Sequence, residues 1–379
     1  MTEMIDRSET DATVTAVIGF GLPGERPEQA EVSDEGWPAF LGAVMAERLS
    51  GLAVAAVEGG RLRLAPAQKE ELLAGQRSAM LRALSVEREM APVGDALEAA
   101  RIPFCVLKGP ALAHTVYPGA SWRPFVDLDL LVRTSDWRGA CRALERLGLT
   151  RRLPEPRPGF DERFGKGAVY VAASGSEVDL HRTLAMGPLG LWMVPEEILE
   201  RTVELLLAGQ RFRRPDDTDL LLHACVHATL GGWPAGRLPL RDVAQIAWRA
   251  RVDWDALWVR AERWRLGATL ALAFRTTRAD LGVDLPPGSE RFLRTVPTRR
   301  DRRLLEAYTT RRGAGGMTLS AVRAIGGVRG KAAYLWALLV PRREFMAVRN
   351  RDGRPSYLRR WTVPAAWVLR RGHRGAGRR

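Results

Sequence analysis

The 379-residue chain has few cysteines, few lysines and no long hydrophobic run. Cys105, Cys141 and Cys225 lie far apart without a C-x-x-C pair, which argues against a disulfide framework and a cysteine-based zinc site. The longest apolar run, residues 332–341, is about half as long as a membrane-spanning helix. The first residues lack the basic-then-apolar order of a secretory signal. We therefore expect a cytoplasmic protein without a transmembrane segment.

Positive charge is confined to one part of the chain. The formal net charge is +14, but residues 290–379 hold 23 Lys plus Arg against 5 Asp plus Glu. The rest is close to neutral, so any attraction to RNA or to an anionic membrane belongs to this last quarter. Such a run also occurs as an ordinary solvated surface on helices, and the sequence does not separate these interpretations.

The apolar share of 46% and the charged share of 27% are typical of a folded globular protein. Hydrophobic spacing predicts an α+β fold, in which helical regions lie on both sides of a small sheet domain. The expected parts are a loose leader (1–35, with a short strand at 13–19), an N-terminal helical region (36–100), a catalytic core (101–185), a helical domain (186–289) and a basic Arg-rich region (290–379).

The core begins with a strand at 102–107, a break at Lys108-Gly109-Pro110 and a helix at 111–117. A strand at 125–132 and a helix at 136–147 follow. Two more strands, at 168–173 and 177–181, are separated by a segment of hairpin composition at 174–176.

Two aspartates interrupt the apolar strand at 125–132. Period-two alternation puts Asp127 and Asp129 on one face, while Leu128, Leu130 and Val132 pack behind them. Two neighbouring carboxylates repel each other and lose hydration when buried, so a cation between them is expected. A lone D-x-D is nevertheless common at solvated strand ends.

The strand at 177–181 adds a third acid, because Asp179 and His181 share one of its faces. Such clusters hold two Mg²⁺ ions in phosphoryl and nucleotidyl transfer. This favours Asp127 and Asp129 as ligands of both ions. Asp179 would hold the ion on the acceptor side and take the hydroxyl proton. His181 would contact the acceptor or orient a carboxylate, or form a structural hydrogen bond.

Phosphate groups need donors, and the turn at Lys108-Gly109 precedes a helix N-terminus that an anion can approach. Lys108 is one of only four lysines, and Arg123 could bind a triphosphate with two hydrogen bonds. Each of these cations is also compatible with an ordinary surface position. His223 and His227 lie one helical turn apart, which fits either helix packing or one side of a cleft opposite the aspartates.

The strings at 106–113, 117–118, 123–124, 127–132 and 178–181 together resemble the uncharacterised nucleotidyltransferases of bacteria, a branch of the polymerase-beta-like superfamily. The resemblance extends over about residues 37–285. It implies a nucleotidyltransferase fold, Mg²⁺ and an NTP, with ATP as the expected nucleotide, and it carries the three metal-binding aspartates over to Asp127, Asp129 and Asp179. One motif departs from the superfamily, whose phosphate turn usually has Gly-Gly or Gly-Ser where this chain has Gly109-Pro110.

The leading hypothesis is an enzyme that transfers a nucleoside monophosphate to a hydroxyl of a small molecule, peptide or protein. A second hypothesis is a non-catalytic binding protein that retains the fold and contacts RNA, a membrane or a partner through its basic region. A third is a regulatory transferase that modifies one partner protein.

Overall fold

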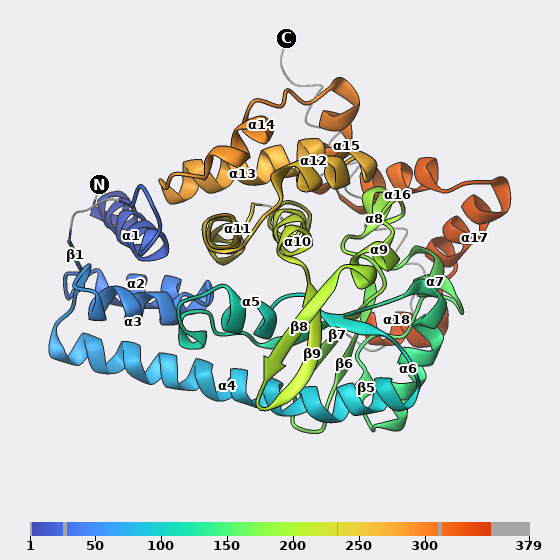
Figure 1. The fold of residues 1–379 in the computed structure, drawn as a ribbon, viewed down its shortest axis with the longest axis horizontal. Coiled ribbons are helices and arrows are strands. Elements are labelled where there is room, and N and C mark those ends of the chain that lie inside the picture. The colour runs from blue at the N-terminus through green and yellow to red at the C-terminus, as the bar shows by residue number, and fades with distance from the viewer. Residues whose placement is uncertain (1, 26–28, 233, 310–312, 350–379) are drawn as a thin grey trace, which may run out of the picture.

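The computed structural model describes residues 2–25, 29–232, 234–309 and 313–349 (Figure 1). It confirms the α+β fold, with one five-stranded sheet between helical regions. The N-terminal elements are α1 (Thr2–Gly19), β1 (Ala30–Glu31), α2 (Trp37–Ala46), α3 (Ser50–Glu58), β2 (Leu62–Arg63) and α4 (Pro66–Ala99).

The central elements are β3 (Phe104–Val106), α5 (Pro110–Thr115), η1 (Ala120–Trp122), β4 (Asp127–Val132), η2 (Thr134–Asp136), α6 (Trp137–Arg146), β5 (Thr150–Arg151), α7 (Phe160–Phe164), β6 (Gly167–Val171) and β7 (Glu177–His181). Next come α8 (Gly187–Gly190), α9 (Pro195–Glu200), β8 (Thr202–Leu207), β9 (Gln210–Pro215), α10 (Asp217–Leu230), α11 (Arg237–Arg249), α12 (Trp254–Arg263), α13 (Gly267–Leu281) and η3 (Pro287–Ser289). The last helices are α14 (Glu290–Leu293), α15 (Arg299–Thr309), α16 (Gly313–Ala324), α17 (Val328–Leu339) and α18 (Arg343–Arg349).

The central sheet has the order β3-β4-β7-β6-β5. Strands β4 and β7 pair in parallel, whereas the other neighbours are antiparallel. The predicted hairpin between β6 and β7 is confirmed, and Gly175 in its loop has a φ of 84°, a conformation that glycine adopts without steric cost. The parallel pair brings the two acidic strands into register side by side.

The two faces of this sheet have different partners. Leu128, Leu130 and Val178 belong to a core cluster that includes residues of α4 and α6. Leu131, on the face of the aspartates, belongs to the other large cluster, to which α10 and α11 contribute. In Figure 1, α4 runs along one side of the sheet and α10 and α11 lie on the other. The alternation predicted for β4 is therefore confirmed.

The expected strand at residues 13–19 is wrong, because this segment lies within helix α1. Val14, Val17 and Ile18 are buried at helical spacing in the core cluster that also contains residues of α2, α3 and α13. Arg241 of α11 donates to the carbonyls of Ile18 (2.6 Å) and Phe20 (2.8 Å) at the helix end. The β-branched residues suggested a strand locally, but tertiary packing overrides such a preference. The segment is thus not a loose leader.

The helical domain expected at 186–289 also contains a hairpin that was not predicted, β8–β9. Ala208 and Gly209 form its two-residue loop, both with positive φ (47° and 79°), as hairpin turns of this length require. Leu205, Leu207 and Phe212 bury their side chains in the core cluster that also contains Leu128 and Leu130. Alternating apolar residues before Gly209 were the signal that the helical interpretation overlooked.

Where it is described, over residues 290–309 and 313–349, the basic region consists of short helices joined by loops. Its buried residues include Phe292, Tyr334 and Phe345, so these helices pack against the rest of the fold. Residues 350–379, which carry part of the predicted RNA or membrane contact, lie outside the described residues. Among the described helices, none has the length and apolar character to span a membrane.

One buried ion pair joins the segment before β4 to helix α11. Arg123, which follows η1, donates two hydrogen bonds to Asp242 of α11, at 2.8 Å and 2.7 Å. The Tyr117 hydroxyl donates a third to the same carboxylate at 2.7 Å. Both charged side chains are almost fully buried, so each depends on the other for compensation.

The start of α3 is fixed against η1 in a similar way. Gln76 of α4 accepts from Ser50 (2.6 Å) and donates to the Ser121 carbonyl (2.7 Å). Gly51 lies so close to η1 that a Cβ atom there would overlap the carbonyl oxygen of Ser121. The first residues of α3 are therefore held firmly beside η1.

We predict that Asp242→Asn lowers the free energy of unfolding by about 3 kcal/mol or more, because it leaves Arg123 buried without a counter-charge. As a control, Glu204→Gln removes the exposed pair with Arg211 and should cost less than about 1 kcal/mol. Urea denaturation of both variants measures the difference. Equal, small effects would show that the buried pair does not join the two parts.

We also predict that Gly51→Ala destabilises the protein by about 1–3 kcal/mol, because the added methyl group has no room beside Ser121. Gly42→Ala in α2 is the matched control, since a methyl group added there would extend into open space. This control should gain about 0.5–1 kcal/mol from the better helix propensity of alanine. Thermal and urea denaturation measure both changes, and destabilisation by Gly42→Ala alone would contradict the packing argument.

Candidate active site

The acidic residues converge where β4 and β7 pair. Asp129 lies opposite Asp179 in the parallel register. The Nε2 atom of His181 is 2.8 Å from Oδ1 of Asp129 and 3.1 Å from Oδ2 of Asp179. Among the described residues, these three form the group whose ligand atoms lie within 4.8 Å of one another. Asp127 stands outside that group.

His181 acts here as a bridge between carboxylates. Ionised carboxylates only accept hydrogen bonds, so Nε2 carries the proton and donates it between Asp129 and Asp179. The side chain is completely buried, which fixes its orientation. Of the roles predicted for His181, the geometry fits that of orienting the carboxylates.

Lys108 points toward the acids from the turn before α5. Its Nζ atom is 3.0 Å from Oδ1 of Asp129 and 4.0 Å from Oδ2 of Asp127. Sequence reasoning predicted that this ammonium binds phosphate, but in the structure it neutralises the aspartates. Gly109 has a φ of 58° and lies against β4, where a Cβ atom would be 3.2 Å from the Asp127 carbonyl oxygen. The turn thus requires glycine at this position.

The neighbouring charges and burial shift the pKa values of the three aspartates in different directions. Burial would raise the pKa of Asp129, but Lys108 and His181 hold it well below its usual range. Burial and the neighbouring Asp129 raise the pKa of Asp127. For Asp179, burial is outweighed by His181 and Lys166, so its pKa is lowered. Asp129 and Asp179 are therefore ionised around neutral pH.

The cluster offers carboxylate oxygens that could coordinate a divalent cation. The Oδ2 atom of Asp129 is buried and has no hydrogen-bond partner within the described part of the chain. A buried carboxylate oxygen without a donor is costly, and a metal ion is one way to compensate it. Asp127 and Asp179 are partly exposed, with 29% and 24% of their side chains accessible, so they can complete an oxygen-rich ligand set. These residues fit Mg²⁺.

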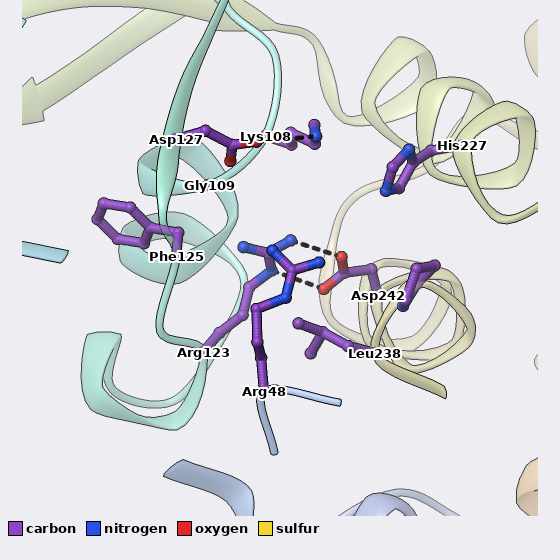
Figure 2. Close-up of a pocket in the computed structure, with 10 residues that line it drawn as sticks. Arg48, Lys108, Gly109, Arg123, Phe125, Asp127, His227, Leu238 and Asp242 are labelled. Atoms are coloured by element: carbon purple, nitrogen blue, oxygen red, sulfur yellow. Dashed lines mark hydrogen bonds and ion pairs between the residues drawn. The ribbon is translucent and has the colours of Figure 1, made fainter. Parts of the chain in front are cut away.

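A cleft opens beside the cluster, between the sheet unit and the helices α10 and α11 (Figure 2). It is lined by Arg48, Lys108, Gly109, Arg123, Phe125, Asp127, His227, Leu238, Pro239 and Asp242. His227 therefore contributes to the side opposite the aspartates, which was one of its two predicted roles. Burial and the nearby Lys108 hold the pKa of His227 well below its usual value, so its ring is neutral.

Four of the residues that line the cleft, Arg48, His227, Leu238 and Pro239, also line a larger neighbouring cavity. This cavity has a volume of about 440 Å³ and is bordered by the end of α2, the end of α10 and the start of α11. Small-ligand sites usually measure about 300–1,000 Å³. The two spaces together can therefore hold a ligand larger than a phosphate group.

Arg123 lines the cleft and is paired with Asp242, so its contact with a triphosphate stays a prediction. Two residues were missed. Lys166, next to β6, is close enough to influence the pKa of Asp179, and burial lowers its own pKa. Arg48 enters the cleft from the N-terminal helices. The scarcity of lysine could have pointed to Lys166, whereas no local pattern distinguishes Arg48 from 53 other arginines.

Comparisons with known proteins assign the chain to a family. A solution structure of the antibiotic-resistance factor ANT(2'')-Ia matches with 16% identity and a TM-score of 0.32, covering 52% of this chain and 96% of that one. No curated protein matches the chain. The family described as uncharacterised nucleotidyltransferase matches residues 33–282, which include every site residue discussed above. The chain belongs to this family of nucleotidyltransferases.

Proposed function

We propose that this protein transfers a nucleoside monophosphate from an NTP, with ATP as the expected donor, to a hydroxyl group of a small molecule, peptide or protein. The observation that carries the proposal is the ionised pair Asp129–Asp179 on adjacent parallel strands, with a buried, unpartnered Asp129 oxygen and with Lys108 and Asp127 lining the neighbouring cleft. Family membership supports the reaction class. Buried, unpaired thiols at all three cysteines are consistent with action in the cytoplasm.

Asp127, Asp129 and Asp179 would hold Mg²⁺, with two ions as in related chemistry, and the bound ions would neutralise the charge that develops on the phosphates. Asp129 is held rigidly by His181 and by strand pairing, so the ligand set is organised before the substrate binds. His227 and the start of α11 line the opposite side of the cleft.

The acceptor oxygen would attack the α-phosphorus as the bond to the β-phosphate oxygen breaks, and pyrophosphate leaves with the electron pair of that bond. Asp179 takes the hydroxyl proton. Its pKa is lowered by His181 and Lys166, so it is ionised before the attack, and its partial exposure leaves it accessible to the acceptor.

We predict that Asp127→Asn lowers the rate of pyrophosphate release from Mg²⁺ and an NTP by about 10²-fold or more, since a group that stabilises developing charge is lost. Incubation with each labelled NTP identifies the donor and labels the acceptor. Glu177→Gln is the matched control, because Glu177 lies opposite Asp127 in the register but forms an ion pair with Arg152. The control should retain activity, and an active Asp127→Asn protein would refute the proposal.

The metal site has a test that does not depend on turnover. At a Mg²⁺ or Mn²⁺ concentration of about 100 times Kd, the wild-type protein should gain about 2.7 kcal/mol of stability from binding. Asp179→Asn removes one ligand and should lose most of this gain, whereas Glu177→Gln should keep it. Thermal unfolding with and without the metal measures both. An equal gain in Asp179→Asn would show that this carboxylate does not bind the ion.

A further inference from the structure

The cations predicted to bind the NTP phosphates have other partners in the structure. The Lys108 ammonium lies 3.0 Å from Asp129, and Arg123 donates two hydrogen bonds to Asp242. Pro110 has no N–H group to offer at the start of α5. A polyphosphate in the cleft would carry several negative charges, so a side-chain cation that is not paired with a carboxylate would strengthen its binding beside the metal ions.

Arg48 also lines the cleft, but it is not paired with a carboxylate of the described residues. It lies between α2 and α3, its side chain is exposed, and it points into the cleft in Figure 2. In the part of the chain that the structure describes, no carboxylate lies within ion-pair distance of its guanidinium group. Its charge nevertheless reaches the acidic cluster, because it lowers the pKa of Asp127 against the larger effects of burial and Asp129.

The backbone at Arg48 is left-handed, with a φ of 59°, but helix termination explains this conformation. Arg101 and Arg265 have a φ of 57° at the ends of α4 and α12. In all three cases the next residue donates back into the helix, as Leu49 does to Val44 at 2.8 Å. The conformation is therefore no sign of function. What distinguishes Arg48 from the other two is that it lines the cleft.

The position of Arg48 is well supported. Ser50 and Gly51, which follow it closely, are held against Gln76 and η1 by the contacts described above. Arg48 also lines both the narrow cleft beside Asp127 and the 440 Å³ cavity, so it lies where the two spaces meet. A guanidinium group can bind phosphate oxygens with two parallel hydrogen bonds.

We propose that Arg48 binds the β- and γ-phosphates of the NTP, the role that sequence reasoning assigned to Lys108 and Arg123. This inference rests on the proposed function, because it assumes that an NTP is the ligand. The neutral His227 on the opposite side adds no positive charge, and Lys108 and Arg123 are paired with Asp129 and Asp242. Arg48 therefore supplies the electrostatic attraction for the polyphosphate.

The backbone conformation provides a clean test, because glycine suits a left-handed helix terminus better than arginine does. Arg48→Gly removes the side chain without straining the fold. Arg101→Gly makes the same change at the end of α4 and is the matched control. Both variants should unfold at or above the wild-type temperature, which shows that any loss of binding is not a loss of folding.

Calorimetry with Mg²⁺ and the α,β-methylene analogue of ATP measures the binding. Arg48→Gly should bind the analogue at least about tenfold more weakly than the wild type, whereas Arg101→Gly should bind it equally well. AMP, which lacks the β- and γ-phosphates, should lose little affinity in Arg48→Gly.

Three results would count against these assignments. Unchanged binding of the analogue by Arg48→Gly would overturn the role of Arg48 and leave the proposed function intact. An equal loss of affinity for AMP would overturn the assignment to the β- and γ-phosphates. Failure of the wild-type protein to bind the analogue or any Mg²⁺–NTP would overturn the proposed function and this inference together.

Discussion

The carboxylate of Asp129 is the group on which the site depends, because it is completely buried and ionised on a core strand. A charge in that position is stable only with close partners, and Lys108 and His181 supply them at 3.0 Å and 2.8 Å. This requirement explains why the turn at Gly109 aims Lys108 at the sheet and why His181 is buried with it.

The acidic face of the sheet changes character along its strands. On β4, the accessible fraction falls from 29% at Asp127 to 0% at Asp129, and Leu131 on the same face joins the apolar core. The carboxylates thus lie at the border between solvent and core, where a cation and a substrate can reach them. The opposite side of the cleft is built by α10 and α11, and Arg48 comes from the N-terminal helices, so three distant segments complete one site.

Local periodicity predicted the acidic site well, because strand alternation needs only neighbouring residues and the β6–β7 hairpin is formed by a short loop. Long-range partners could not be predicted in this way. Arg123 and Asp242 are 119 residues apart, and no spacing rule connects them. The helical conformation of residues 13–19 is likewise stabilised by packing on segments far along the chain. The β8–β9 hairpin is different, since its Gly209 turn was readable from the sequence and was overlooked.

Two of the four lysines in an arginine-rich chain lie at the site, and the chemistry of the two cations explains this placement. An arginine presents a planar fork that pairs with both oxygens of one carboxylate, as Arg123 does with Asp242. A lysine ammonium is a compact point charge, so Lys108 fits between Asp127 and Asp129 and leaves one oxygen of Asp129 without a partner. Lysine at 108 thus compensates the buried charge while the carboxylate keeps an oxygen for a metal ion.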